Sequence, residues 1–357
     1  MTLHVFNPEH DIVLAADLAN FTAPHAGRQL RTDLGFLPAI WAGDDDAVLV
    51  DNVEQTERVW RRFSVRTSSL RVIGKSRFLS WKSATSLSSV TRIEPWGWDK
   101  ALCAALKRRG VDEQLLPTAA QLENIRQLSH RRMAAQLLSR LQREGTVGEA
   151  FECRIADEVT TLLERYGQMV VKAPWSSSGR GVRFLDNKQV TVNNSLWLHN
   201  IITAQGSVMV EPYYNKVKDF GMEFEALADG TVTYLGLSLF HTKNGAYTGN
   251  IIATESAKRE LISRYIAMSL LDDVREEICC GLAEIFKGRY VGPLGVDMMI
   301  VRGGLLHPCV EINLRRTMGH AALALTPRDD VRRVMRIDYN GTNYKLRINK
   351  LSSNKLL

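Results

Sequence analysis

The decisive stretch of this 357-residue chain is VVKAPWSSSGRGV, residues 170–182. A β-branched run ends there in Lys172, and a proline, three serines and two glycines that flank an arginine follow it. Glycines free backbone N–H groups to wrap an anion, and serine hydroxyls and cationic side chains add contacts to it. The stretch lacks the GxxxxGK[ST] and GxGxxG patterns of other nucleotide loops. We therefore expect a phosphate-binding loop of another kind, with an ordinary Gly- and Ser-rich hairpin as the alternative.

Farther along the chain, VDMMIVRGGLLHPCVEIN (296–313) has the pattern of a hairpin that carries oxygen ligands. Asp297, Glu311 and Asn313 are of the type that magnesium prefers, and side-chain alternation places Glu311 and Asn313 on one face of a strand. A two-residue turn at the Gly-Gly pair would send Asp297 to the other face. A three-residue loop, or a bulge near Pro308, would bring it opposite Glu311. We predict one of these two; polar positions on a solvated sheet face are the alternative.

Between these segments, VMVEPYYNKVKDFGMEFEAL (208–227) places acceptors and aromatic rings at the end of a strand. Glu211 and Tyr213 suit the edge and face of an adenine, and Asp219 suits ribose hydroxyls. The triplet that begins at Asp219 imitates the DFG of protein kinases. In this chain, however, the glycine loop follows the lysine, which is the wrong order for a kinase.

The first 115 residues alternate between short apolar strands and helical or turn-rich segments. The sequence predicts strands over 3–6, 47–52 and 69–74. This pattern is typical of an open α/β domain.

The succession of lysine strand, glycine-rich loop, Glu-x-Tyr segment, downstream aspartate and Asp…Glu-x-Asn hairpin resembles the ATP-grasp superfamily. The resemblance covers about residues 116–330, and residues 1–115 are similar to the Rossmann-like domain that usually precedes this fold. It implies an α/β chain with two α+β subdomains, 116–210 and 211–330, that grip ATP. Residues 331–357 would form a C-terminal tail.

The resemblance also implies roles for individual residues. Lys172 would contact the α- and β-phosphates, Glu211 and the backbone around Tyr213 would hold adenine, and Asp219 would hold the ribose. The loop that closes over the phosphates would consist of Ser176, Ser177, Ser178, Gly179, Arg180 and Gly181. One or two Mg²⁺ ions, with Mn²⁺ as an alternative, would be held by Asp297, Glu311 and Asn313.

Two arginine assignments stay open under the same resemblance. A basic residue at the start of the central helix, Arg132 or Arg131, would touch phosphate. Relatives in this group often carry an arginine shortly before the metal aspartate, where this chain has Gly295-Val296. The catalytic arginine that steadies the transferred phosphoryl group would then be Arg315 or Arg316, with a plain surface charge as the alternative for Arg316.

The resemblance implies an ATP-dependent carboxylate–amine ligase that forms an acyl phosphate and acts on small, amino-acid-like substrates. A small-molecule kinase on the same scaffold and a nucleotide-binding protein without turnover are the alternatives. A homodimer is compatible with the sequence.

Substrate specificity is expected where the first strand ends, because open α/β domains bind ligands there. The candidates are Asn7, Glu9, His10, Asp11, Trp96 and Trp98. An acidic pocket formed by Glu9 and Asp11 would suit an amine, whereas helix capping and ring packing are the structural alternatives. The segment 241–250 would line the acceptor site or act as a lid.

Composition restricts the remaining classes of function. Five scattered cysteines give neither a disulfide framework nor zinc spacing, which favours the cytoplasm. The net charge of +7 is spread along the chain without a nucleic-acid motif, so acidic small molecules explain it as well as nucleic acid does. No apolar run approaches the roughly 20 residues of a membrane span, and the N-terminus does not resemble a signal peptide.

Overall fold

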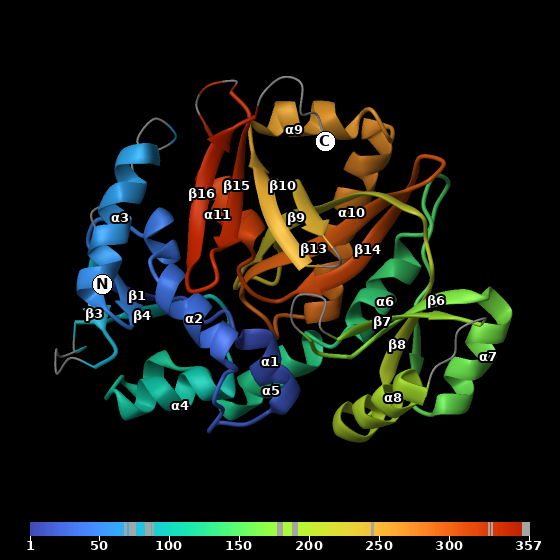
Figure 1. The fold of residues 1–357 in the computed structure, drawn as a ribbon, viewed down its shortest axis with the longest axis horizontal. Coiled ribbons are helices and arrows are strands. Elements are labelled where there is room, and N and C mark those ends of the chain that lie inside the picture. Colours follow the sequence, from blue (N-terminus) through green and yellow to red (C-terminus); the bar gives the residue numbers. More distant parts are fainter. Residues whose placement is uncertain are drawn as a thin grey trace.

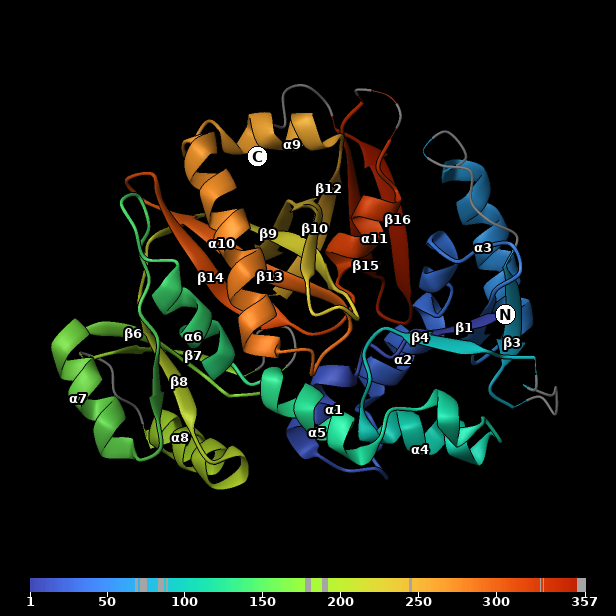
Figure 2. The ribbon, with the colours of Figure 1, turned by 180° about the vertical axis from the view of Figure 1, so that it is seen from behind.

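The computed structural model describes residues 1–67, 70, 76–82, 87, 89–176, 181–187, 192–243, 246–327, 329 and 331–351. These residues form four sheets of four strands each, with helices packed against them (Figures 1 and 2). The expected α/β class is confirmed. Within the described part of the chain, no helix has both the length and the apolar character needed to cross a membrane.

The N-terminal part is a parallel sheet in the order β3-β2-β1-β4, as expected for an open α/β domain. Its strands are β1 (Thr2–Val5), β2 (Ala47–Val50), β3 (Arg77–Ser80) and β4 (Arg92–Pro95). Its helices are α1 (His10–Ala16), α2 (His25–Leu34), α3 (Val53–Thr67) and α4 (Lys100–Arg108), with 3-10 turns at Leu37–Ile40 and Glu113–Leu115. Most of the strand expected over 69–74 lies outside the described residues. The carboxyl ends of β1 and β4 bring residues 6–11 next to residues 96–99.

The second sheet is antiparallel, in the order β5-β8-β6-β7, and it carries Lys172 at the end of β6. Its strands are β5 (Phe151–Cys153), β6 (Gln168–Lys172), β7 (Val182–Asp186) and β8 (Val208–Pro212). The helices of this region are α5 (Ala119–Leu128), α6 (Arg132–Arg140), α7 (Ala156–Tyr166) and α8 (Val192–Gln205). Gly167 adopts a φ of 74° where α7 ends and β6 begins, a conformation that glycine reaches without a steric penalty.

The third sheet has the order β10-β9-β13-β14 and carries the residues that the sequence predicted as metal ligands. Its strands are β9 (Lys216–Ala226), β10 (Val232–Ser238), β13 (Gly292–Val301) and β14 (Leu305–Asn313), and helices α9 (Glu255–Ile262) and α10 (Met268–Phe286) accompany them. The even-numbered residues Phe220 and Phe224 of β9 join a core that includes Ile278 of α10. Because side chains alternate along a strand, the odd-numbered residues Asp219 and Glu223 point to the opposite face.

The fourth sheet, in the order β11-β12-β15-β16, includes the segment that the sequence suggested would be a tail. Its strands are β11 (Phe240–Lys243), β12 (Ala246–Ile252), β15 (Arg333–Tyr339) and β16 (Tyr344–Lys350), and α11 (Met318–Ala324) packs nearby. The structure therefore differs from the expected tail over 333–350. The β15–β16 hairpin lies between the N-terminal part and the third sheet in both views (Figures 1 and 2). It is tied to α2, because Asp33 accepts hydrogen bonds from Asn343 and from the Tyr344 N–H.

Candidate active site

The three metal-ligand candidates lie on the β13–β14 hairpin. Asp297 pairs with Glu311, and the register between the strands shifts immediately next to Asp297. The extra residues that produce the shift lie around Pro308. Of the two geometries that the sequence predicted, the bulge near this proline is the one observed, and it places the two carboxylates opposite each other. Asn313 follows Glu311 by two residues and shares its face.

The environment of Asp297 disfavours its charged form. Burial, together with the neighbouring carboxylates Glu311 and Glu223, raises the pKa of Asp297 to about 8. Asn313 Nδ2 donates a hydrogen bond of 3.2 Å to Asp297 Oδ2. A divalent cation would offset the cost of this charge, and two carboxylates with an amide oxygen are ligands suited to Mg²⁺. Within the described ranges, no three His, Cys, Asp or Glu side chains converge as a metal site, so the set that fits an ion needs the amide of Asn313.

The two candidate catalytic arginines point to different places. Arg315 Nε and Nη2 each donate to a carboxylate oxygen of Asp11 at 2.8 Å, and Nη2 also donates to Asn313 Oδ1 at 2.9 Å. Burial alone would lower the pKa of Arg315, but Asp11 raises it, so the guanidinium stays charged. Arg316 instead donates to Glu94 Oε2 at 3.0 Å. Of these two arginines, Arg315 is therefore the one that contacts a metal-ligand candidate.

Lys172 and Glu211 come from adjacent strands and form a buried ion pair. Lys172 Nζ lies 2.5 Å from Glu211 Oε1, and each side chain is 9% exposed. The strands β6 and β8 are paired, which places the two residues on neighbouring positions of one face. The residues expected at the phosphates and at the adenine are thus brought together.

The structure favours Arg131 over Arg132 as the arginine that joins the two halves of the site. Arg131 Nη1 donates to Ser176 Oγ at 2.8 Å, and Nη2 donates to Glu311 Oε1 at 2.8 Å. Arg132 donates to Gln127 and lies 3.7 Å from Glu152, on another side. Successive residues of a helix point about 100° apart, so only one of two adjacent arginines at the start of α6 can face the site.

Only the ends of the predicted phosphate loop can be placed. Ser177, Ser178, Gly179 and Arg180 lie outside the described residues. Ser176 lines the cavity described below. The carbonyl of Gly181 accepts the Ala173 N–H at 2.7 Å, and a Cβ added at Gly181 would lie 2.3 Å from Ser176 Cβ. The close approach of the two loop ends therefore requires a glycine at position 181.

Tyr213 and Asp219, which were predicted to contact the adenine and the ribose, lie in different environments. The ring of Tyr213 is 45% exposed and packs edge-on against Phe184 at 6.0 Å. Asp219 Oδ2 accepts hydrogen bonds from Lys216 Nζ at 2.6 Å and from Thr242 Oγ1 at 2.5 Å. Since Thr242 lines the cavity, Asp219 lies at its edge.

Two of the N-terminal candidates support the fold around Asp99. Asn7 Nδ2 donates to Asp99 Oδ2 at 3.0 Å, and His10 Nδ1 lies 3.3 Å from the same oxygen. His10 packs so closely on Gly97 that a Cβ there would lie 2.7 Å from the imidazole.

The two N-terminal carboxylates do not form the acidic pocket that the sequence suggested. Arg31 Nη1 donates to Glu9 Oε1 at 2.7 Å, and Arg315 pairs with Asp11. Each carboxylate already has its own arginine partner.

The tryptophans also differ in their positions. Trp96 lines the cavity and contacts Phe6 edge-on, with ring centroids 5.0 Å apart. Trp98 is partly buried against the hydrophobic core. Of the two, Trp96 is the ring that can contact a ligand in the cavity.

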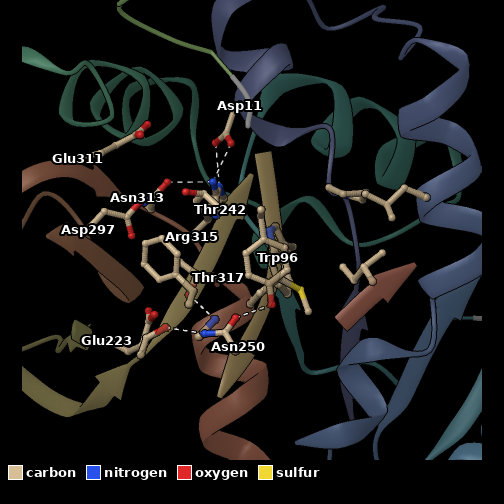
Figure 3. A pocket seen from close by; sticks show the side chains of 18 of the residues that line it. Asp11, Trp96, Glu223, Thr242, Asn250, Asp297, Glu311, Asn313, Arg315 and Thr317 are labelled. Carbon is tan, nitrogen blue, oxygen red and sulfur yellow. Dashed lines mark hydrogen bonds and ion pairs between the residues drawn. The ribbon is translucent and has the colours of Figure 1, made fainter. Parts of the chain in front are cut away.

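A cavity of about 290 Å³ unites the hairpin, the N-terminal part and the fourth sheet (Figure 3). The predicted residues that line it are Asp11, Trp96, Ser176, Asp297, Glu311, Asn313 and Arg315. Sequence reasoning did not single out three polar residues of its wall, Glu223, Ser238 and Thr317. The expectation for the segment 241–250 agrees with the structure in part, because Thr242, Tyr247 and Asn250 line the cavity. The sequence did contain one indication for Glu223. It lies four residues after Asp219 on the same strand, so the two side chains were expected to share one face.

No family model matches the sequence, and no curated protein matches it either. Solved structures do resemble the fold. The biotin carboxylase of Campylobacter jejuni, in a β-γ-ATP complex, has a TM-score of 0.53 at 12% identity over 96% of this chain and 77% of its own. The biotin carboxylase domain of Hydrogenobacter thermophilus 2-oxoglutarate carboxylase, with MgADP, ADP and bicarbonate, has a TM-score of 0.52 at 13% identity over 94% and 74%. N5-carboxyaminoimidazole synthetase of Staphylococcus aureus with ADP has a TM-score of 0.49 at 13% identity over 94% and 82%.

Proposed function

We propose that this chain, which has the ATP-grasp fold, is an ATP- and magnesium-dependent ligase that activates a carboxylate for attack by an amine. The observation that carries the proposal is the pairing of Asp297 with Glu311 in a cavity that also contains Arg315. Fold alone does not assign an activity, so the proposal depends on these side chains.

The nucleotide would lie between subdomains 116–210 and 211–330. Lys172 supplies a point charge for phosphate oxygens, and Ser176 supplies a hydroxyl donor at the start of the loop. Arg131 lies within hydrogen-bonding distance of both Ser176 and Glu311, which suits it to bridge the phosphates and the metal ligands. Glu211 and Asp219 offer carboxylate acceptors for the adenine amino group and the ribose hydroxyls.

Asp297, Glu311 and Asn313 would hold one or two Mg²⁺ ions, and Mn²⁺ could replace them. When bound, the metal neutralises phosphate charge and polarises the γ-phosphoryl group. Arg315, fixed by Asp11, adds a positive charge at the same end of the cavity. Preorganised charge of this kind is the main contribution of a protein to phosphoryl transfer.

The reaction then has two steps. A carboxylate oxygen of the substrate attacks the γ-phosphorus, and the bond from phosphorus to the β,γ-bridging oxygen breaks to release ADP. The amine nitrogen next attacks the carbonyl carbon of the acyl phosphate, and the carbon–oxygen bond breaks to release phosphate. The nitrogen attacks as the neutral amine, so an ammonium substrate first loses one proton to solvent, and a second proton leaves as the amide forms. The products are an amide, ADP and phosphate.

The experiment that tests this function measures ADP and free phosphate from MgATP across pooled carboxylates and amines. A ligase releases phosphate only when both co-substrates are present. ADP with a phosphorylated product and no free phosphate would indicate a kinase. Nucleotide binding without turnover in any pool would indicate a binding protein. Asp297→Asn is the control, and it should abolish any release that depends on this site.

A further inference from the structure

Glu223 is a buried carboxylate on the same wall of the cavity as the metal-ligand candidates. The side chain belongs to β9, is 3% exposed and lines the cavity. Its strand pairs with β13 so that Glu223 faces Gly295 and Gly221 faces Asp297. A Cβ at Gly295 would lie 2.7 Å from Glu223 Oε2, so the glycine makes room for this carboxylate.

The one basic side chain within ion-pair distance of Glu223, among the described residues, is His320. Its Nδ1 lies 2.9 Å from Glu223 Oε2. The Thr317 N–H already donates to the same nitrogen at 3.1 Å, and Nε2 faces the Phe224 carbonyl at 3.4 Å. Both ring nitrogens of His320 therefore have partners other than Glu223, namely the Thr317 N–H and the Phe224 carbonyl. Within the described chain, Glu223 Oε2 has no hydrogen-bond donor.

Two of the other carboxylates of the cavity have arginine partners. Asp11 is neutralised by Arg315, and Glu311 accepts a hydrogen bond from Arg131. Asp297 and Glu311 together form the candidate metal site. Glu223 is 3% exposed, and among the described residues it has no arginine or lysine within ion-pair distance. Such an arrangement is costly unless a ligand compensates it.

The polar groups beside Glu223 mainly present oxygen acceptors. The Tyr247 hydroxyl donates to Asn250 Oδ1, and Asn250 Nδ2 donates to Ser238 Oγ at 2.9 Å. In this series of hydrogen bonds the donor groups bind neighbouring oxygen atoms, so the groups that remain for a ligand are oxygen lone pairs. Figure 3 shows Glu223 and Asn250 at one end of the cavity and Asp11 at the other, with Arg315 and Thr317 between them. An ammonium group, which has three donors and no acceptor, matches the end that contains Glu223.

We propose that Glu223 is the subsite for the positively charged nitrogen of the amine substrate. The inference rests on the proposed ligase function and identifies the amine as a small primary ammonium compound. Phe240 and Met318 line the same cavity and provide an apolar surface for its alkyl part. Glu223 recognises and orients this substrate, whereas the phosphates and the metal lie toward Asp297.

The test uses two probes of similar shape, n-butylammonium and n-butanol, titrated into the 357-residue chain loaded with magnesium and a non-hydrolysable ATP analogue. Fluorescence of Trp96, which lines the cavity, provides a binding signal, and calorimetry provides a second one. Wild type should bind butylammonium about tenfold or more tightly than butanol. Glu223→Gln, which keeps the shape and removes the charge, should lose that preference. Glu225→Gln, two residues along the same strand and not among the cavity-lining residues, should keep it.

If the wild-type protein binds the two probes equally, that result alone overturns the proposal. Retention of the preference in Glu223→Gln would also overturn it. Displacement of butylammonium by K⁺, but not by tetramethylammonium at the same ionic strength, would assign the subsite to an inorganic cation instead. The affinity for the ATP analogue is measured on the same samples. Failure of wild type to bind nucleotide would contradict the proposed ligase, whereas loss of the probe preference with nucleotide binding intact would contradict only the subsite.

Discussion

Asp11 and Arg315 form a bidentate ion pair, with both hydrogen bonds at 2.8 Å, although 304 positions separate them in the sequence. The pair joins α1 of the N-terminal part to Arg315, two residues after the end of β14. Arg315 also donates to Asn313, so the carboxylate of Asp11 helps to orient a metal-ligand candidate through the arginine. The N-terminal part therefore belongs to the candidate active site rather than being a separate appendage.

At position 315, the geometry of the guanidinium group should affect activity more than its charge alone. Arg315→Lys keeps the charge but cannot make the two parallel bonds to Asp11, so we expect phosphate release to fall about 100-fold. Arg316→Lys is the matched control, because Arg316 contacts Glu94 outside the cavity lining, and it should stay within about threefold of wild type. Steady-state kinetics of ADP release measure both. Equal losses in the two variants would contradict the assignment of Arg315.

The charge of Asp297 should be costly for stability and essential for activity. Because burial and the neighbouring carboxylates raise the pKa of Asp297 to about 8, the neutral Asp297→Asn side chain should fit the metal-free protein better. We expect a gain of about 1 kcal/mol in the free energy of unfolding and a loss of MgATP turnover of at least about 100-fold. Thermal unfolding without metal and phosphate release with metal measure the two effects. Full activity in this variant would contradict the metal assignment.

The adjacent residues Arg131 and Arg132 provide a second matched pair. Arg131→Ala removes a cation that contacts both Ser176 and Glu311, so kcat/KM for ATP should fall about 100-fold or more. Arg132→Ala removes contacts to Gln127 and Glu152 and should change kcat/KM by less than about fivefold. The reverse order would restore Arg132 as the phosphate contact. Calorimetric titration with an ATP analogue separates the effect on binding from the effect on turnover.

Asp46 should contribute to the dependence of the free energy of unfolding on pH. Burial alone would raise the pKa of Asp46, but the N–H groups of Gly43 and Thr2, with help from His4, lower it to about 2. A carboxyl whose pKa is lowered by folding contributes stability above its unfolded pKa, and this contribution disappears as the pH falls through the folded pKa. Asp46→Asn should therefore cost about 1 kcal/mol at pH 7, and the difference from wild type should vanish between about pH 4 and pH 2. Urea denaturation across this range measures it; a difference that does not depend on pH would contradict the assignment.

Local signals were sufficient to predict the hairpin that carries the metal-ligand candidates. The sequence predicted a three-residue loop or a bulge near Pro308, which cannot donate to the strand ladder, and the observed bulge places Asp297 opposite Glu311. Alternation along the strand then fixed the face of Asn313. These features depend on neighbours within one hairpin, which is why the sequence could predict them.

Features that depend on contacts between distant segments could not be predicted. The sequence prediction was Arg132, with Arg131 as the alternative, and the choice stayed open because the rotation of α6 relative to the hairpin decides between them. The roles of Glu9 and Asp11 changed because their arginine partners lie on α2 and after β14. Glu223 alternates with apolar residues, which is also the pattern of a strand with one solvated face. Only the packing of α11 and β12 over that face turns it into the wall of a cavity.

The most direct test of the ligase account follows oxygen from the carboxylate substrate to phosphate. The protein is incubated with MgATP, an amine pool and carboxylates labelled with ¹⁸O, and the phosphate is examined by ³¹P NMR. The account predicts free phosphate that carries one ¹⁸O atom, formed only when both co-substrates are present and absent with Asp297→Asn. Phosphate without label, or a stable phosphorylated product in place of free phosphate, would contradict it.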